Sequence, residues 1–239
     1  GAGERHDAVN GTMPSMNVVL FGATGMIGQG VLRECLLDPD VQRVVTVGRA
    51  PTGQQHPKLR EIVHADLLDL TAIEQDLTDL DACFFCLGIS VAGLTEEEYT
   101  RVTYGIAMAA ATTLVRLNPQ MTFVFVSGLG TDSTERGRTM WARVKGKTEN
   151  AILKLPFRRA YMVRPGFIQP LHGIRSRTKL YRVFYPVAGP LFPLLRRLFP
   201  NAITTTEQLG RGVLAAAKHG APSVILGTGE INRLTIPPA

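Results

Sequence analysis

Residues 16–28 read MNVVLFGATGMIG, and this stretch decides the fold. Its first six residues are apolar apart from one asparagine, which is the pattern of a short buried strand, and Gly22 ends that strand. From Met26 onward apolar side chains recur at helical spacing, and Asp38-Pro39 ends the helix. A strand, a glycine-rich turn and a helix therefore follow one another directly.

The turn GATGMIG, residues 22–28, has the spacing of a phosphate-binding loop. Glycines allow a tight turn and let backbone N–H groups approach a pyrophosphate at the helix N-terminus, where the helix dipole favours an anion. The strand before the turn and the helix after it are the context that such a motif requires. The sequence thus predicts a dinucleotide site in which the pyrophosphate contacts Gly22, Thr24, Gly25, Met26, Ile27 and Gly28.

The rest of the chain alternates short apolar runs with helical patterns. Capping boxes are expected at Thr95–Glu98, opening a long helix to about Leu117, and at Thr204–Glu207, opening a helix that ends at His219. Strands that are apolar on both faces and alternate with helices favour a parallel sheet covered on both sides. The predicted fold class is α/β: a doubly wound parallel-sheet Rossmann fold with a small C-terminal cap.

We divide the chain by composition. Residues 1–15 are polar and are expected to be a disordered lead. Residues 16–164 and 204–228 form the predicted NAD(P)-binding Rossmann domain. Residues 165–203 break the alternation with many prolines and arginines and are predicted to form the cap on the substrate side of the cleft.

The end of the second predicted strand bears on which dinucleotide is bound. An NAD site usually carries an acidic residue about 20 residues beyond the glycines, bonded to the ribose 2′-hydroxyl. This chain has Val47-Gly48-Arg49 there and no carboxylate until Glu61. Because a guanidinium can hold a 2′-phosphate bidentately, Arg49 favours NADP(H), with NAD(H) as the alternative. An arginine at a strand end can equally be a solvated charge.

Composition excludes several classes of protein. Three cysteines in 239 residues exclude a disulfide framework and favour a reducing compartment, so a cytoplasmic location is expected. Cys83 and Cys86 lie in one predicted strand, on opposite faces and roughly 10 Å apart, and are expected to pack in the core. No apolar stretch reaches the roughly 20 residues of a membrane span, and no His or Cys spacing indicates a metal site.

The net charge of +6 conceals an asymmetry. Residues 158–239 contain twelve Lys or Arg against two Asp or Glu, so an anionic partner is expected there. Residues 171–200 carry six of these cations, with aromatic and leucine residues between them and no carboxylate: Arg175, Arg177, Lys179, Arg182, Arg196 and Arg197. This stretch could form a pocket wall for a small or amphiphilic substrate, a peripheral membrane contact, a dimer contact, or ordinary core packing with solvated arginines. No motif for nucleic acid accompanies it, and the oligomeric state stays open.

Over residues 16–228 the chain resembles the short-chain dehydrogenase/reductase superfamily, and within it the atypical, epimerase-like branch that includes the Tat-interacting-protein-like oxidoreductases. The resemblance rests on the glycine turn and on residues after the later strands: Asp66, Leu67, Leu87, Gly88, Ser127, Lys145, Arg164, Pro165 and Gly166. It implies that Asp66 and Leu67 lie against the adenine and that Leu87 and Gly88 pass under the cofactor. It also implies that Pro165 lies beside the nicotinamide.

The catalytic residues implied by the resemblance are Ser127, Lys145 and the position of Trp141. The family motif is Tyr-x-x-x-Lys, whereas this chain reads WARVK at 141–145. An indole N–H has no accessible acid pKa, so Trp141 cannot replace the tyrosine as general acid. Ser127 could still polarise a carbonyl, and Lys145 could still hold the nicotinamide ribose.

Other residues are candidates to replace the missing tyrosine. His172 could reach the cleft as a base, although a histidine on a surface loop is commoner. Lys147 and Glu149 are expected on a solvated helix face. Two functions follow: an NADP(H)-dependent oxidoreductase or epimerase-like enzyme, or an NADP(H) sensor that regulates a partner without turnover.

Overall fold

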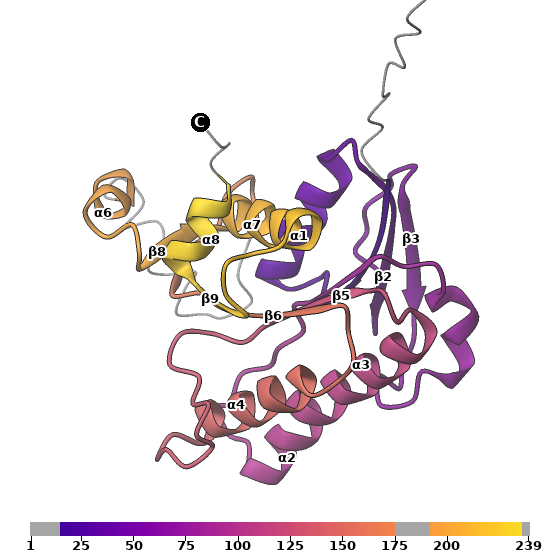
Figure 1. The fold of residues 1–239 in the computed structure, drawn as a ribbon, viewed down its shortest axis with the longest axis horizontal. Coiled ribbons are helices and arrows are strands. Elements are labelled where there is room, and N and C mark those ends of the chain that lie inside the picture. The colour runs from indigo at the N-terminus through magenta and orange to yellow at the C-terminus, as the bar shows by residue number, and fades with distance from the viewer. Residues whose placement is uncertain (1–14, 175–191, 236–239) are drawn as a thin grey trace, which may run out of the picture.

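The computed structural model describes residues 15–174 and 192–235. Its centre is a seven-stranded sheet in the order β3-β2-β1-β4-β5-β6-β9, in which every pair is parallel (Figure 1). These strands are β1 (Met16–Phe21), β2 (Val41–Gly48), β3 (Leu59–Val63), β4 (Ala82–Phe85), β5 (Thr122–Val126), β6 (Arg159–Arg164) and β9 (Ile225–Gly227). The doubly wound α/β fold predicted from the sequence is confirmed.

Helices cover both faces of this sheet (Figure 1). One face carries α1 (Met26–Leu37), α7 (Thr206–His219) and α8 (Thr228–Leu234). The other carries η1 (Thr71–Leu77), α2 (Glu96–Thr100), the π-helical turn η2 (Arg101–Gly105), α3 (Ile106–Leu117) and α4 (Met140–Leu153). The strand order reverses at β1, between β2 and β4, and ligands of open α/β sheets bind at such a switch point.

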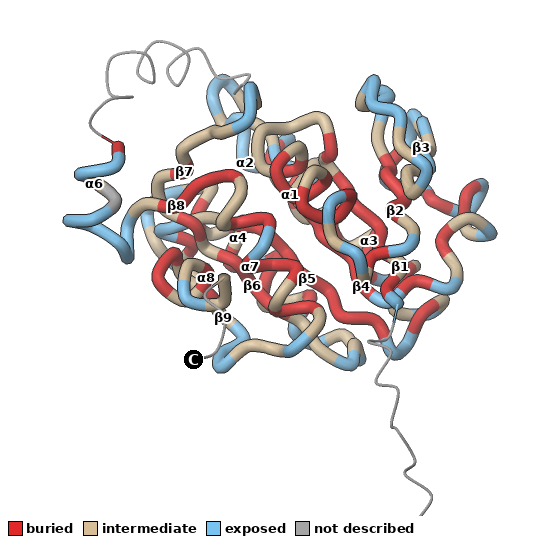
Figure 2. The backbone as a smooth tube through the Cα atoms, turned by 90° about the horizontal axis from the view of Figure 1, so that it is seen from above, coloured by how far each residue is buried: buried red, intermediate tan, exposed pale blue. Residues whose placement is uncertain are grey.

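The apolar run of β1 follows from this two-sided cover. Val18 and Leu20 belong to the core under α1 and α7, and Val19 and Phe21 belong to the core on the opposite face. All four are fully buried, as Figure 2 shows for the centre of the sheet. Cys83 is buried in one core, whereas Cys86, just after β4, is partly buried and packs against the other, so the expected core packing is confirmed for Cys83. Burial raises the pKa of the Cys86 thiol to about 12.

The long helix expected from Thr95 to Leu117 is present as α2, η2 and α3 in succession. Thr95 and Glu98 form the predicted capping box: the backbone N–H of Glu98 donates to Thr95 Oγ1, and that of Thr95 donates to Glu98 Oε2. The sequence did not predict the π-helical turn in the middle. π-Helical turns are rare and occur frequently at functional sites.

The second predicted cap is placed one residue too early. Thr205, not Thr204, is the N-cap of α7, and its side chain accepts from the backbone N–H of Gln208. The Thr204 hydroxyl instead donates to Asn232 Oδ1. Three consecutive threonines gave no local signal for which of them caps the helix.

Outside the main sheet, β7 (Phe167–Gln169) pairs in parallel with β8 (Ile203–Thr205), and α6 (Phe192–Leu198) precedes β8. Figure 1 shows α6 standing away from the sheet. β7, α6 and the first residue of β8 belong to the segment 165–203 that the sequence predicts as a cap. The predictions made on Arg175, Arg177, Lys179 and Arg182 lie outside the described residues.

Candidate active site

The glycine turn joins β1 to α1 at the carboxyl edge of the sheet. Gly22 has φ +82°, and a Cβ there would lie 2.5 Å from the backbone nitrogen of Leu87. A Cβ on Gly28 would lie 2.0 Å from the Gly22 carbonyl oxygen. Two glycines are therefore required by the close approach of three backbone segments: the turn, the first turn of α1 and the segment after β4.

The N-terminus of α1 is open toward a ligand. Its N-cap, Gly25, has no side chain that could cap the helix, and no acidic residue lies in the first turn. The amide of Gly25 closes the turn by donating to the Gly22 carbonyl at 3.0 Å. The following N–H groups are thus available to an anion, in the field of the helix dipole.

A cleft of about 1340 Å³ runs along this edge of the sheet. Its walls are the glycine turn and the ends of β2, β3 and β4 on one side and the start of the α2–η2–α3 helix on the other. Ten of the predicted cofactor-binding residues line it: Gly22, Thr24, Gly25, Met26, Ile27, Arg49, Asp66, Leu67, Leu87 and Gly88. Gly28 lies just behind them within α1.

Arg49 and Asp66 are both exposed at the adenine end predicted for this cleft. Asp66 Oδ1 accepts the backbone N–H of Leu68 at 3.0 Å, which holds the turn after β3. Leu67 is 3% exposed and packs into the core. The nearby Glu61 carboxylate accepts the backbone N–H of Thr52 at 2.6 Å, so Glu61 is engaged in the loop after β2.

Four predicted residues, Ser127, Trp141, Lys145 and Pro165, lie outside the lining of this cleft. They gather at the ends of β5 and β6 and on α4. Lys145 Nζ donates to the Ser127 carbonyl oxygen, and the backbone N–H of Leu129 donates to the Pro165 carbonyl oxygen at 2.9 Å. The structure therefore brings three of the predicted catalytic and nicotinamide-side segments together.

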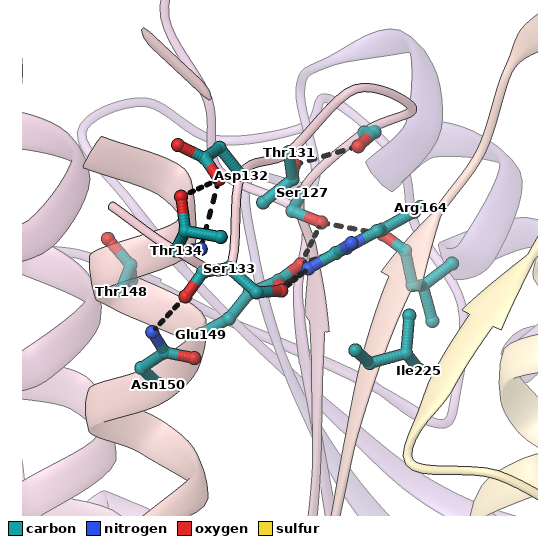
Figure 3. Close-up of polar contacts among 12 residues, drawn as sticks. Ser127, Thr131, Asp132, Ser133, Thr134, Thr148, Glu149, Asn150, Arg164 and Ile225 are labelled. Atoms are coloured by element: carbon teal, nitrogen blue, oxygen red, sulfur yellow. Dashed lines mark hydrogen bonds and ion pairs between the residues drawn. The ribbon is translucent and has the colours of Figure 1, made fainter. Parts of the chain in front are cut away.

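Ser127 is turned into the protein. It is 5% exposed, and its hydroxyl lies 2.5 Å from Glu149 Oε1 (Figure 3). The Val163 carbonyl oxygen, at 3.2 Å, is a second acceptor, but Glu149 is nearer and a carboxylate cannot donate, so the single hydroxyl proton of Ser127 is given to Glu149. In this arrangement Ser127 has no proton left for a substrate carbonyl.

Glu149 is held in turn by Arg164. Its carboxylate is 1% exposed and lies 2.5 Å from Arg164 Nη2 through Oε2 and 3.1 Å from Nε through Oε1. Arg164 Nη2 also donates to the Ser133 hydroxyl at 2.5 Å. A buried, bidentate pair of this kind satisfies both charges and fixes the end of β6 against α4.

Lys145 lies one helical turn before Glu149. Its side chain is withdrawn from solvent, and this desolvation lowers the pKa of the ammonium, while the negative charge of Glu149 opposes the shift. The ammonium is 5.8 Å from the centre of the Trp141 ring. Trp141 thus packs beside Lys145, where the tyrosine of the resembled motif would stand.

His172 does not join these residues. It has φ +56°, and its Nε2 lies 2.6 Å from Glu207 Oε2 on the first turn of α7. This hydrogen bond is the main cause that lowers the pKa of Glu207. His172 does not line the cleft, and its observed contacts connect the loop after β7 to α7.

The sequence reasoning missed three charged residues. Glu149 was expected on a solvated face and is fully buried, and Arg164 was noted only as part of a turn. The available signal was that Glu149 follows Lys145 by four residues and so shares its helix face. Arg101, which lines the cleft, carried no signal in the sequence.

The cleft meets the requirements of a dinucleotide. It joins an uncapped helix N-terminus, two glycines that cannot carry a Cβ and an arginine at the end of β2. Among the described residues, no group of three His, Cys, Asp or Glu side chains could hold a metal ion. No helix in this part of the chain is long and apolar enough to cross a bilayer.

Fold and cleft together define an NAD(P)-binding protein of the Rossmann oxidoreductase class. The comparison with protein families agrees: the chain belongs to the family described as semialdehyde dehydrogenase, NAD binding domain, whose model matches residues 17–152. The matched region contains the glycine turn, Ser127, Lys145 and Glu149. The finer assignment to the Tat-interacting-protein-like branch is not confirmed.

Curated relatives come from fungi. The chain is similar to "Protein FMP52-2, mitochondrial" of Scheffersomyces stipitis, with 31% identity over 62% of this chain and 65% of that protein. It is 29% identical to "Protein fmp52, mitochondrial" of Emericella nidulans, over 64% of this chain and 66% of that protein. With "Protein FMP52, mitochondrial" of Meyerozyma guilliermondii it shares 25% identity over 91% of this chain and 94% of that protein. The chain thus covers slightly less than two thirds of the first two relatives.

Solved structures share the fold at low sequence identity. MoeE5 in complex with UDP-glucose and NAD has a TM-score of 0.65, with 19% identity over 91% of this chain and 79% of that one. The Bordetella bronchiseptica enzyme WbmF in complex with NAD+ has a TM-score of 0.62, with 16% identity over 93% of this chain and 77% of that one. These likenesses show the fold alone.

The expectation of a cytoplasmic location is wrong on this comparison, because the curated relatives are named as mitochondrial proteins. Cysteine content did not distinguish a cytoplasmic from a mitochondrial location. A chain with three cysteines and no disulfide framework fits any reducing compartment, so the prediction chose the commonest one.

Proposed function

We propose that the chain is an NADP(H)-dependent oxidoreductase or epimerase-like enzyme that acts on a small or amphiphilic carbonyl or alcohol. The observation that carries this proposal is the cleft, in which the glycine turn and Arg49 lie along one edge of the sheet. Arg49 at the end of β2 would hold the 2′-phosphate, and Asp66 and Leu67 would lie against the adenine. NAD(H) is the alternative cofactor, and we retain the epimerase-like branch as part of the proposal.

The residues after β5 and β6 would serve the nicotinamide end. A bound reduced nicotinamide supplies a hydride to the substrate. Lys145 would hold the nicotinamide ribose, Pro165 would lie beside the ring, and Leu87 and Gly88 would pass beneath the cofactor. Since Trp141 has no acidic proton and the Ser127 proton is given to Glu149, Lys145 is the predicted catalytic residue left to supply a proton.

An apolar part of the substrate is supported by Leu129. This side chain is 67% exposed, although its backbone is fixed by the hydrogen bond to Pro165. A large apolar group held in water next to the predicted nicotinamide site suits an apolar or amphiphilic substrate. The segment 165–203 would close the same side as a cap.

Binding of the cofactor is the first test. Purified chain is titrated with NADPH and with NADH, following the emission of Trp141, the only tryptophan. We expect saturable quenching and NADPH binding at least about tenfold tighter than NADH, a gap of about 1.4 kcal/mol. Arg49→Gln should abolish the preference and leave NADH binding unchanged. Equal affinities in the native chain would refute the role of Arg49.

A second candidate function is a dinucleotide sensor without turnover, and two observations at the predicted nicotinamide end favour it. Trp141 stands where the resembled motif has tyrosine, and Ser127 is committed to Glu149. Trp141→Tyr rebuilds the Tyr-x-x-x-Lys motif and is compared with Trp141→Phe in a panel of carbonyl substrates with NADPH. Turnover by the native chain supports the enzyme. Turnover only in the tyrosine variant, with cofactor binding unchanged, supports the sensor.

We also propose a mitochondrial location, which the names of the relatives support.

A peripheral membrane contact through residues 171–200 is a further part of the proposal. In α6 and just after it, Leu194, Leu198 and Phe199 are 55%, 60% and 55% exposed. Exposed apolar groups in a segment with six cations and no carboxylate suit an anionic lipid surface. Sedimentation with vesicles that contain an anionic lipid tests the membrane contact. Binding to these vesicles should be weaker for Leu194→Ser/Leu198→Ser and at high salt. Equal binding of the native chain to neutral vesicles would refute the contact.

A further inference from the structure

The wall of the cleft opposite the glycine turn is made by the α2–η2–α3 helix. Four of its residues line the cleft: Glu98, Arg101, Val102 and Ile106. Their spacing of three, four and eight residues keeps them on one helical face. The adjacent Thr103 and Ala107 are buried on the core side. Arg101 is the cationic member of this face, and it is exposed.

Arg101 forms no ion pair within the part of the chain that the structure describes. Other charged residues of the α2–η2–α3 helix are paired: Glu96 forms an ion pair with Arg143 of α4, and Arg116 forms one with Glu74 of η1. Its neighbour Glu98 is occupied by the capping box, in which its carboxylate accepts from the backbone N–H of Thr95 at 2.8 Å and from the Thr95 hydroxyl at 3.0 Å.

The other charges of the cleft leave this guanidinium available. The lining contains two arginines, Arg49 and Arg101, and two carboxylates, Asp66 and Glu98. Both carboxylates accept backbone N–H groups of their own loops, Asp66 from Leu68 and Glu98 from Thr95. Neither guanidinium forms an ion pair within the described residues, so both can take an anionic ligand, one from the end of β2 and one from the helix wall.

The backbone at Arg101 is unusual as well. The residue opens η2, the π-helical turn Arg101–Gly105 within an otherwise α-helical segment. A π turn sacrifices regular helical hydrogen bonding and is found frequently at functional sites. It stands at the cleft, in the first half of the helical segment 96–117.

We propose that Arg101 binds a phosphate group of the dinucleotide from the helix wall, so that Arg49 and Arg101 hold the cofactor from two sides of the cleft. This inference rests on the proposed function, since it concerns the same cofactor. A guanidinium recognises phosphate through parallel N–H donors and keeps its charge at any working pH. An arginine that is merely solvated would make no difference to affinity.

The test measures binding by calorimetry, so it needs no substrate and no turnover. Arg101→Gln and Arg101→Lys are compared with Arg116→Gln, which removes the same charge from the far end of the same helix. The ligands are NADPH, NADH and 2′,5′-ADP. Thermal unfolding of each variant confirms that it is folded.

We expect Arg101→Gln to bind NADPH about tenfold more weakly or worse, the size of a charge-assisted hydrogen bond. Arg101→Lys should recover part of the loss, and Arg116→Gln should match the native chain. Raising the salt concentration should reduce the difference in NADPH affinity between the native chain and Arg101→Gln. An equal loss for NADPH and NADH identifies the pyrophosphate as the contact, and a loss confined to NADPH and 2′,5′-ADP identifies the 2′-phosphate.

Two negative results are distinguishable. Arg101→Gln with the affinities of Arg116→Gln, in a chain that binds NADPH, overturns the role of Arg101 and leaves the proposed function intact. Failure of the folded native chain to bind NADPH or NADH overturns the proposed function and this inference with it.

Discussion

Glu149 is the side chain whose removal should cost the most stability near the candidate active site. Its carboxylate is 1% exposed and receives two hydrogen bonds from Arg164 and one from the Ser127 hydroxyl. Glu149→Gln keeps the size and shape of the side chain and removes the charge. Arg164, whose side chain is 18% exposed, then retains a positive charge without its partner.

The magnitude follows from that uncompensated charge. Breaking a buried ion pair by removing one partner costs about 3–5 kcal/mol, because the remaining charge has lost solvent without gaining a counter-charge. For a chain of 239 residues the melting temperature should fall by roughly 6–20 °C, at about 2–4 °C per kcal/mol. Replacing both residues, as in Glu149→Leu/Arg164→Leu, should be less damaging than Glu149→Gln alone, since no charge is left unpaired.

Guanidinium unfolding followed by Trp141 emission and by circular dichroism measures these differences. The matched control is Glu74→Gln, which breaks the exposed pair with Arg116, and it should cost less than about 1 kcal/mol. Equal effects of Glu149→Gln and Glu74→Gln would refute the reasoning. The reasoning would also be refuted if the stability lost by Glu149→Leu/Arg164→Leu equalled the sum of the losses of Glu149→Leu and Arg164→Leu measured separately.

Three further outcomes are expected. Gly28→Ala places a Cβ 2.0 Å from the Gly22 carbonyl oxygen and should lower the melting temperature by several degrees, whereas Gly88→Ala, with open space around the added carbon, should change it by about 1 °C at most. Asn118→Ala leaves the buried N–H of Leu80 and the carbonyl of Leu77 without their partner and should cost about 1–3 kcal/mol in chemical unfolding. Burial lowers the pKa of Lys145 from its ordinary value of 10.5, so the unfolded chain binds this proton more tightly than the folded chain. The free energy of unfolding, relative to that of Lys145→Met, should therefore rise with pH between the lowered pKa and 10.5. A difference between the two chains that does not change with pH would contradict this.

The cofactor half of the site could be predicted because its chemistry lies in the backbone. The turn of residues 22–28 has to follow a strand and open a helix, and both neighbours are visible in the local apolar pattern. Arg49 follows β2 directly, and Asp66 lies three residues beyond the end of β3 in the same sheet. In a parallel sheet all these carboxyl ends share one edge, so strand order is enough to bring them together.

The arrangement of the residues predicted to be catalytic depends on contacts that the sequence does not display. Ser127, Glu149 and Arg164 come from β5, α4 and β6, and only the packing of α4 against those strands decides that the serine turns inward. Polar residues crowd the middle of α4, where Lys145, Lys147, Thr148, Glu149 and Asn150 lie close together, so Glu149 looked solvated. The π-helical turn at Arg101 was likewise invisible, because π turns have no sequence signature comparable to a capping box.

The two halves of the site use different elements, and this separation bears on the missing tyrosine. The cleft is lined from the ends of β1 to β4, from the α2–η2–α3 helix and by Ile168 of β7, whereas the Glu149 network connects the ends of β5 and β6 with α4. A change at the Glu149 network therefore leaves the glycine turn and Arg49 in place. Loss of the tyrosine would remove proton transfer without removing affinity for the dinucleotide. Binding of NADPH alone cannot separate an enzyme from a sensor, which is why Trp141→Tyr must be compared with Trp141→Phe by turnover.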